Sequence, residues 1–212
     1  MVSRQKHGVH VYAESGGDHN ESLGNEFREA FSKFLGRMES GVTQRPKLHP
    51  CGSRKEAYDN FKTALAQGRN ALLLVDSEAP IAPDHEMVGA YRPWAHLRDR
   101  DNWDRPANAS DGDCHLMVQC MENWFVADWD ATGTFFGQGF DTRRKPGGAV
   151  ERIAKDDAIS SLELASKNCK TKAQYGKGVH SFKLLALIDP KKVMKSSPWA
   201  ERFIDELKRR KP

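Results

Sequence analysis

The sequence predicts an α/β fold in which a mainly parallel sheet is flanked by helices and followed by a helical C-terminal part. Two short apolar runs, 9–13 and 71–75, are bounded by glycine, proline and acidic residues, as strands commonly are. Between them, apolar side chains recur at steps of three and four residues, which is typical of amphipathic helices. Strands that alternate with helices form parallel sheets covered by helices, and we expect roughly three to five strands.

The first half of the chain supplies the elements of this sheet in order. An amphipathic helix is expected over about 20–38, and a short strand at 47–51 is weakened by its prolines. Ser53 is predicted to cap the next helix, with Glu56 three residues later completing a capping box. The run 71–75 is continuously apolar, so we expect a strand buried on both faces of the sheet.

The character of the sequence changes over residues 79–113, where prolines and charges predict a long loop insertion with little regular structure. Loops of this length inside a compact domain are usually functional or act as lids. A strand or buried turn is expected at 116–119 and a helix at 122–127, after which Asp128 is predicted to cap a short helix that ends near Gly137.

These elements divide the chain into two parts of one domain. Residues 1–137 form the predicted α/β core with its insertion, and residues 138–212 form a basic loop and a helical part packed on the same domain. Apolar periodicity in the second part predicts helices over 158–165, 182–188 and 198–208.

Composition limits the classes of protein to consider. The 212 residues carry 33 basic and 29 acidic side chains, a formal net charge of +4, which is too small an excess to indicate nucleic-acid binding by itself. The four cysteines lack the spacing of a zinc site. We find no signal peptide and no apolar run near the roughly 20 residues that span a bilayer. We therefore expect a cytoplasmic protein with reduced thiols and no membrane association.

Acidic residues follow two of the predicted strands. Glu14, with Asp18 four residues later, follows the first strand, and Asp76 and Glu78 follow the strand at 71–75. Ligands gather at the carboxyl ends of parallel strands, and residues two apart in a strand point the same way. Crowded carboxylates repel each other by about 1–4 kcal/mol per close pair, a cost that a hard cation removes. We predict a Mg²⁺ or Mn²⁺ site there, while the alternative is a solvated loop in which Asp18 caps the next helix.

The same residues carry a resemblance to Toprim proteins. Glu14-Ser15-Gly16-Gly17-Asp18 resembles the first Toprim motif, and the apolar strand that ends in Asp76-Ser77-Glu78 resembles the second. Ser15 replaces the usual glycine and Glu78 replaces the last aspartate. The resemblance covers about residues 8–80 and implies a Toprim-like, Rossmann-like core that handles phosphodiesters with magnesium, as in topoisomerases, primases and nucleases of the overcoming-lysogenization-defect type.

The wider chain is similar to an uncharacterised bacterial family, domain-of-unknown-function family 4276. Family members are often encoded beside ATPases in settings suggestive of phage defence, so the resemblance implies an ATPase partner. The likeness runs nearly end to end, and it rests on Cys51-Gly52-Ser53-Arg54, Val75-Asp76-Ser77-Glu78, Trp103-Asp104-Arg105-Pro106, residues 115–125, and Tyr175 with Lys177 and His180.

Other residues are candidates for supporting roles. Glu122 is either a further metal ligand or general base, or a carboxylate favoured at a helix start. Lys177 could stabilise a phosphoryl transition state, and His180 could contact phosphate or transfer a proton, although such residues are often surface groups. The candidate phosphate contacts are Arg54, Arg105, Arg143, Arg144 and Lys145.

Together these features predict a divalent-metal-dependent nuclease that acts on nucleic acid, with an ATPase as a partner. A second hypothesis is a non-catalytic subunit that keeps the Toprim shape and binds an ATPase or nucleic acid. A third, a phosphohydrolase with Asp76 as nucleophile, lacks the accompanying motifs. A homo-oligomer is compatible with the sequence.

Overall fold

The computed structural model describes residues 8–16, 21–38, 45–87 and 89–210. Its main sheet has four parallel strands in the order β2-β1-β3-β6. The strands are β1 (His10–Ala13), β2 (Lys47–Pro50), β3 (Ala71–Asp76) and β6 (Cys114–Met117). The prediction of a parallel α/β sheet flanked by helices is therefore confirmed.

Both faces of β3 are buried, as its continuous apolar run predicted, because its side chains alternate between two cores. Leu72 and Leu74 belong to a core with α1 (Glu21–Gly36) and the C-terminal helices, whereas Leu73 and Val75 belong to a core with α2 (Arg54–Ala66). The helices that follow residue 137 thus share a core with the first helix of the chain.

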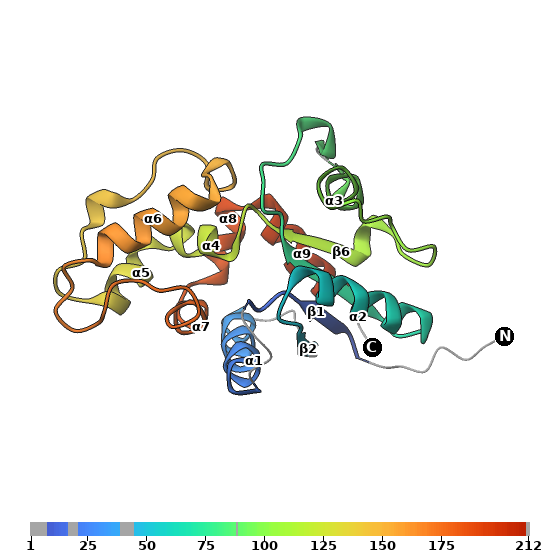
Figure 1. The fold of residues 1–212 in the computed structure, drawn as a ribbon, viewed down its shortest axis with the longest axis horizontal. Helices are drawn as coiled ribbons and strands as arrows, with labels where there is room; N and C mark the ends of the chain where they lie inside the picture. The colour runs from blue at the N-terminus through green and yellow to red at the C-terminus, as the bar shows by residue number, and fades with distance from the viewer. Residues whose placement is uncertain (1–7, 17–20, 39–44, 88, 211–212) are drawn as a thin grey trace.

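The helical elements of the second half lie beside the sheet and along its edge strand β6 (Figure 1). Figure 1 shows α4, α5 and α6, coloured from yellow-green to orange, as a group beside the sheet, while α9 lies along β6. The helices are α4 (Met121–Ala127), α5 (Trp129–Phe136), α6 (Lys155–Ser166), α7 (Ser181–Leu185), α8 (Pro190–Ser196) and α9 (Pro198–Arg209).

The two predicted helix caps are confirmed. Ser53 and Glu56 form the capping box of α2, in which each side chain accepts a hydrogen bond from the other residue's backbone N–H. Asp128 accepts a hydrogen bond from the Ala131 N–H at the start of α5. These contacts satisfy N–H groups that a helix end leaves without partners.

The prediction of an irregular insertion at 79–113 is wrong. The segment contains the hairpin β4–β5 (Glu86–Met87 and Ala90–Tyr91) and helix α3 (Pro93–Asp101), which packs on the α2 side of the sheet. Pro93 is the first residue of α3, where the fixed φ of proline favours a helix and its missing N–H costs nothing. The same reason explains the unpredicted helix α8, which begins at Pro190.

Short 3₁₀ turns complete the described part of the chain. They lie at Pro83–His85, Asp111–Asp113, Thr142–Arg144 and Val150–Arg152. Within the described ranges, we find no helix that is both long and apolar enough to cross a membrane.

Phe34 tests the core that joins α1 to the second half of the chain. Its buried ring stacks on Trp124 of α4 with the ring centroids 5.5 Å apart. Replacing Phe34 with alanine should lower the free energy of unfolding by about 3–5 kcal/mol, because the substitution leaves a cavity. Leu187→Ala is the control, since this side chain is 44% exposed and should change stability by less than about 0.5 kcal/mol. Urea unfolding measures the free energy of unfolding of both variants. Equal losses of stability in Phe34→Ala and Leu187→Ala would contradict this description of the core.

Candidate metal centre

Glu14, Asp76 and Glu78 converge at the carboxyl end of the sheet. Glu14 follows β1 and Asp76 ends β3, and these two strands are neighbours in the sheet. One carboxylate oxygen from each of the three residues lies within 4.8 Å of the other two. The predicted convergence of these side chains is therefore confirmed, and such a set of oxygens could hold a hard divalent cation.

Asp76 is the most deeply placed of the three carboxylates. It is only 3% exposed, and its Oδ1 accepts a hydrogen bond of 3.0 Å from the Met121 N–H. The Asp76 N–H donates in turn to Glu14 Oε2 at 3.1 Å. Burial, followed by the charges of Glu14 and Glu122, raises the pKa of Asp76 well above its ordinary value.

The pKa of Glu14 is also raised, chiefly by burial, although the hydrogen bond from Asp76 and the charge of Arg54 act in the opposite direction. Two neighbouring carboxyl groups thus resist ionisation in the folded protein. A cation bound between them would remove this penalty, because it favours the charged form of both groups.

Glu78 reaches the centre in a way that the sequence did not predict. Strand β3 ends at Asp76, so the alternation of a strand does not orient Glu78. Its backbone is instead left-handed, with φ 63°, and its N–H donates to Gln119 O at 2.8 Å. A glutamate in this conformation costs about 1–3 kcal/mol, and such residues cluster at functional sites.

Cationic side chains already contact two of the three carboxylates. Lys155 Nζ lies 2.5 Å from Glu78 Oε1, and Arg100 lies 3.9 Å from Glu78 Oε2. Arg54 lies 3.8 Å from Glu14 and donates to the backbone oxygen of Asp76 at 3.0 Å. Both charge and hydrogen bonding therefore stabilise the ionised centre.

Arg54 holds the centre in place rather than facing solvent as a phosphate contact. Its guanidinium forms a two-point ion pair with Asp101, at 2.8 and 2.9 Å, and lies over the Trp103 ring. Because Asp101 belongs to α3, this pair ties the insertion to the metal centre. Burial raises the pKa of Asp101, yet the hydrogen bonds and charges of Arg54 and Arg100 outweigh this effect and the net pKa is lowered.

Glu122 lies beside the centre but outside the group of three converging carboxylates. It is fully buried in the first turn of α4, and its Oε1 accepts a hydrogen bond of 2.8 Å from the Tyr175 hydroxyl. Its Oε2 has no hydrogen-bond partner among the described residues, but Lys177 Nζ lies 4.0 Å away. Burial lowers the pKa of Lys177, yet Glu122 and Asp76 outweigh this effect and the net pKa is raised.

A cavity of about 160 Å³ opens onto these groups. Glu14, Asp76 and Lys177 supply its charged side chains, so the predicted Lys177 lies in the same site as the predicted metal ligands. The remaining lining residues are Ser15, Gly16, Leu23, Met117, Met121, Gly178, Ser181 and Phe182.

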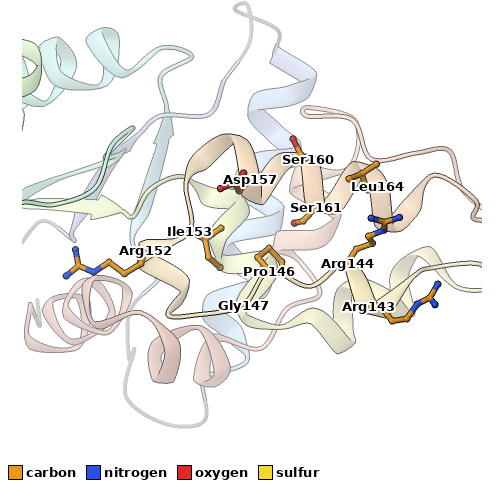
Figure 2. A pocket seen from close by; sticks show the side chains of 10 residues that line it. All are labelled: Arg143, Arg144, Pro146, Gly147, Arg152, Ile153, Asp157, Ser160, Ser161 and Leu164. Atoms are coloured by element: carbon orange, nitrogen blue, oxygen red, sulfur yellow. The ribbon is translucent and has the colours of Figure 1, made fainter.

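The other predicted contacts lie elsewhere. Arg105 is exposed and lines a separate depression beside α3. Lys145 is exposed. Arg143 and Arg144 line a separate pocket of about 600 Å³. They lie at one end of this pocket, and Arg152 lies at the other end (Figure 2). Asp18 lies outside the described residues.

His180 is placed in the core, not on the cavity wall. It is buried against the rings of Phe135 and Phe136, and its Nδ1 accepts a hydrogen bond from the Gly176 N–H. Burial, followed by the charges of Lys183 and Lys172, lowers the pKa of His180, which favours a neutral ring. This placement contradicts its predicted role as a phosphate contact.

Three residues of the site, Arg100, Asp101 and Lys155, escaped prediction from the sequence. Arg100 and Asp101 fall in the segment that we expected to be an irregular loop. Lys155 begins α6 after Ala154, which offers no side-chain cap, so neither a motif nor a helix-start signal marks it.

The fold and the site define an α/β protein with a candidate divalent-metal centre at the carboxyl ends of its strands. The family described as "Domain of unknown function (DUF4276)" matches residues 21–208, and the chain belongs to this family. No curated protein and no solved structure matches the chain.

Replacing Asp76 with asparagine should stabilise the metal-free protein. A raised carboxyl pKa means that stability is full below the ordinary value of 3.8 and is lost as pH rises through the folded-state value. The amide carries no charge and keeps the oxygen that accepts from Met121. At pH 8 in EDTA we expect a gain of about 1 kcal/mol or more, which is roughly 2–4 °C in Tm per kcal/mol.

The gain from Asp76→Asn should grow as pH rises, which differential scanning fluorimetry across a pH series can measure. Asp130→Asn is the matched control, because the Asp130 side chain is 93% exposed and should leave Tm nearly unchanged. A lower Tm for Asp76→Asn at every pH would contradict the raised pKa.

Proposed function

We propose that the protein is a divalent-metal-dependent nuclease of the Toprim type, which hydrolyses phosphodiester bonds of nucleic acid with Mg²⁺ or Mn²⁺. The observation that carries the proposal is the convergence of Glu14, Asp76 and Glu78 within 4.8 Å beside a cavity that also contains Lys177. Hard carboxylate oxygens suit these ions, which commonly keep open positions for water and phosphate oxygens.

The order of the acidic residues supports the Toprim type. Glu14 follows the first strand, and Asp76-Ser77-Glu78 follows a central buried strand, as in the two motifs that the chain resembles. Both departures from those motifs are accommodated. Ser15 Oγ accepts a hydrogen bond from the Gly52 N–H, which links the loops after β1 and β2, and the left-handed backbone of Glu78 directs its longer side chain to the centre.

The side chains in and beside the cavity would divide the work of hydrolysis between them. Glu14, Asp76 and Glu78 would hold the ion, which when bound polarises the phosphate and lowers the pKa of an attacking water. Lys177 would stabilise the negative charge that develops on the phosphoryl oxygens. Glu122, fixed by Tyr175, orients Lys177 and favours its charged form, so its role here is that of a positioning residue.

The cellular setting follows from the resemblance that the sequence carries. The proposed nuclease would be the effector of an ATPase-coupled phage-defence system, with the ATPase as a partner in the cytoplasm. The exposed basic loop with Arg143, Arg144 and Lys145 and the exposed Arg105 would contact nucleic-acid phosphates away from the metal centre.

One observation favours a second candidate, a non-catalytic subunit that binds an ATPase or nucleic acid. Lys155 and Arg54 already contact Glu78 and Glu14, so internal cations partly fulfil the role of a metal ion. Calorimetry separates the two candidates, because a non-catalytic subunit would bind neither Mg²⁺ nor Mn²⁺ at millimolar concentration and would still associate with its partner.

The nuclease proposal predicts how three variants cleave labelled DNA and RNA with Mn²⁺, with the ATPase partner present if the isolated chain is inactive. The cleavage rate of Asp76→Ala should fall by more than the roughly 10–100-fold loss that metal enzymes show when a residue outside the ligand set is replaced. The cleavage rate of Lys177→Ala should fall by about 10²–10³-fold, because the lysine stabilises the transition state. This variant should still bind Mn²⁺. Asp130→Ala should cleave like the wild type. Full activity of Asp76→Ala would show that the nuclease centre lies elsewhere.

A further inference from the structure

Lys155 connects the helical part of the chain to the metal centre. Its Nζ lies 2.5 Å from Glu78 Oε1, and in the described part of the chain this carboxylate is the charged partner of the ammonium group. The side chain is 24% exposed, so the pair lies at the rim of the centre, where a substrate could approach. Arg100, the other cation near Glu78, is already bound to Asp101.

The position of Lys155 corresponds to that of a second cation. An ion held by Glu78 would lie about 2 Å from a carboxylate oxygen, while the ammonium lies 2.5 Å from Oε1 of the same group. The ammonium and an ion would therefore share the Glu78 carboxylate, as two cations held close together do in a two-metal site. In such sites both cations contact the transferring phosphate.

The charges of the cluster favour one divalent ion. Five carboxylates and four cationic side chains gather at the metal centre and its cavity through ion pairs and through the convergence of the three carboxylates. Their formal charge is −1 when all are ionised; they are Glu14, Asp76, Glu78, Asp101, Glu122, Arg54, Arg100, Lys155 and Lys177. One divalent ion brings the cluster to +1, which a single phosphodiester neutralises. A second ion would leave an excess of positive charge.

From the shared carboxylate and the charge of the cluster, we propose that Lys155 is a substrate-binding residue that contacts the scissile phosphate in place of a second metal ion. The proposal rests on the proposed function. Before substrate binds, Glu78 holds the ammonium. When an ion takes part of the charge of Glu78, the ammonium is attracted less strongly to that carboxylate and donates to a non-bridging phosphate oxygen. No bond to Lys155 is made or broken in this exchange.

The test measures binding of a short fluorescent oligothymidylate by the full chain, with excess Ca²⁺ in place of the catalytic ion, over a series of KCl concentrations. Lys155→Gln should reduce the slope of log K against log salt by roughly 0.7, the contribution of one phosphate contact on a single strand. Lys155→Arg, which keeps the charge, should retain the slope. Calorimetry should show that Lys155→Gln binds Mn²⁺ no more weakly than the wild type, because a competitor for Glu78 is gone.

Lys192→Gln is the matched control for a purely structural role. Lys192 also joins two elements through a buried carboxylate, with Nζ 2.7 Å from Asp128 Oδ1, but it lies outside the metal centre. It should change thermal stability and leave the salt slope unchanged.

The outcomes separate this inference from the proposed function. A wild-type slope for Lys155→Gln, or weaker Mn²⁺ binding by that variant, would overturn the inference alone, provided that the wild type binds Mn²⁺ and the oligonucleotide. Failure of the wild type to bind Mn²⁺ or to bind the oligonucleotide in Ca²⁺, with the ATPase partner added if the isolated chain does not bind, would overturn both.

Discussion

The burial of two neighbouring carboxyl groups, Asp76 and Glu14, is the constraint around which the carboxyl end of the sheet is arranged. Neighbouring parallel strands bring the two carboxyl groups together, and burial removes the water that would otherwise screen them. The protein partly offsets this cost with the Met121 and Asp76 N–H donors and with Arg54. The raised pKa values of both carboxyl groups show that these contacts do not remove the cost, which explains why a divalent cation suits this position.

The elements around the centre are distant in the sequence but depend on one another in space. The insertion contributes Asp101, which fixes Arg54, and the helical part contributes Lys155, which pairs with Glu78. Helix α4 supplies Met121 and Glu122 from the end of the neighbouring strand β6. Each segment therefore contributes a hydrogen-bond donor, a cation or the partner of a cation to the group of carboxylates at the ends of β1 and β3.

Much of the sheet and the identity of the acidic centre could be predicted from the sequence, because both leave local signals. The buried strand β3 is a continuous apolar run, and Glu14, Asp76 and Glu78 lie at or just after the ends of apolar runs. The insertion was mispredicted because proline was interpreted as a breaker, whereas Pro93 begins a helix. The left-handed backbone of Glu78 and the pairing of Lys155 depend on contacts between distant segments, so a local pattern could not reveal them.

The most direct test of the central claim is a crystal structure of the protein soaked with Mn²⁺, in which anomalous scattering locates the ion. The account predicts one strong peak about 2–2.5 Å from carboxylate oxygens of Glu14 and Asp76, with Glu78 as a direct or water-mediated ligand. A peak at another site, or no peak between these carboxylates at millimolar Mn²⁺, would contradict it.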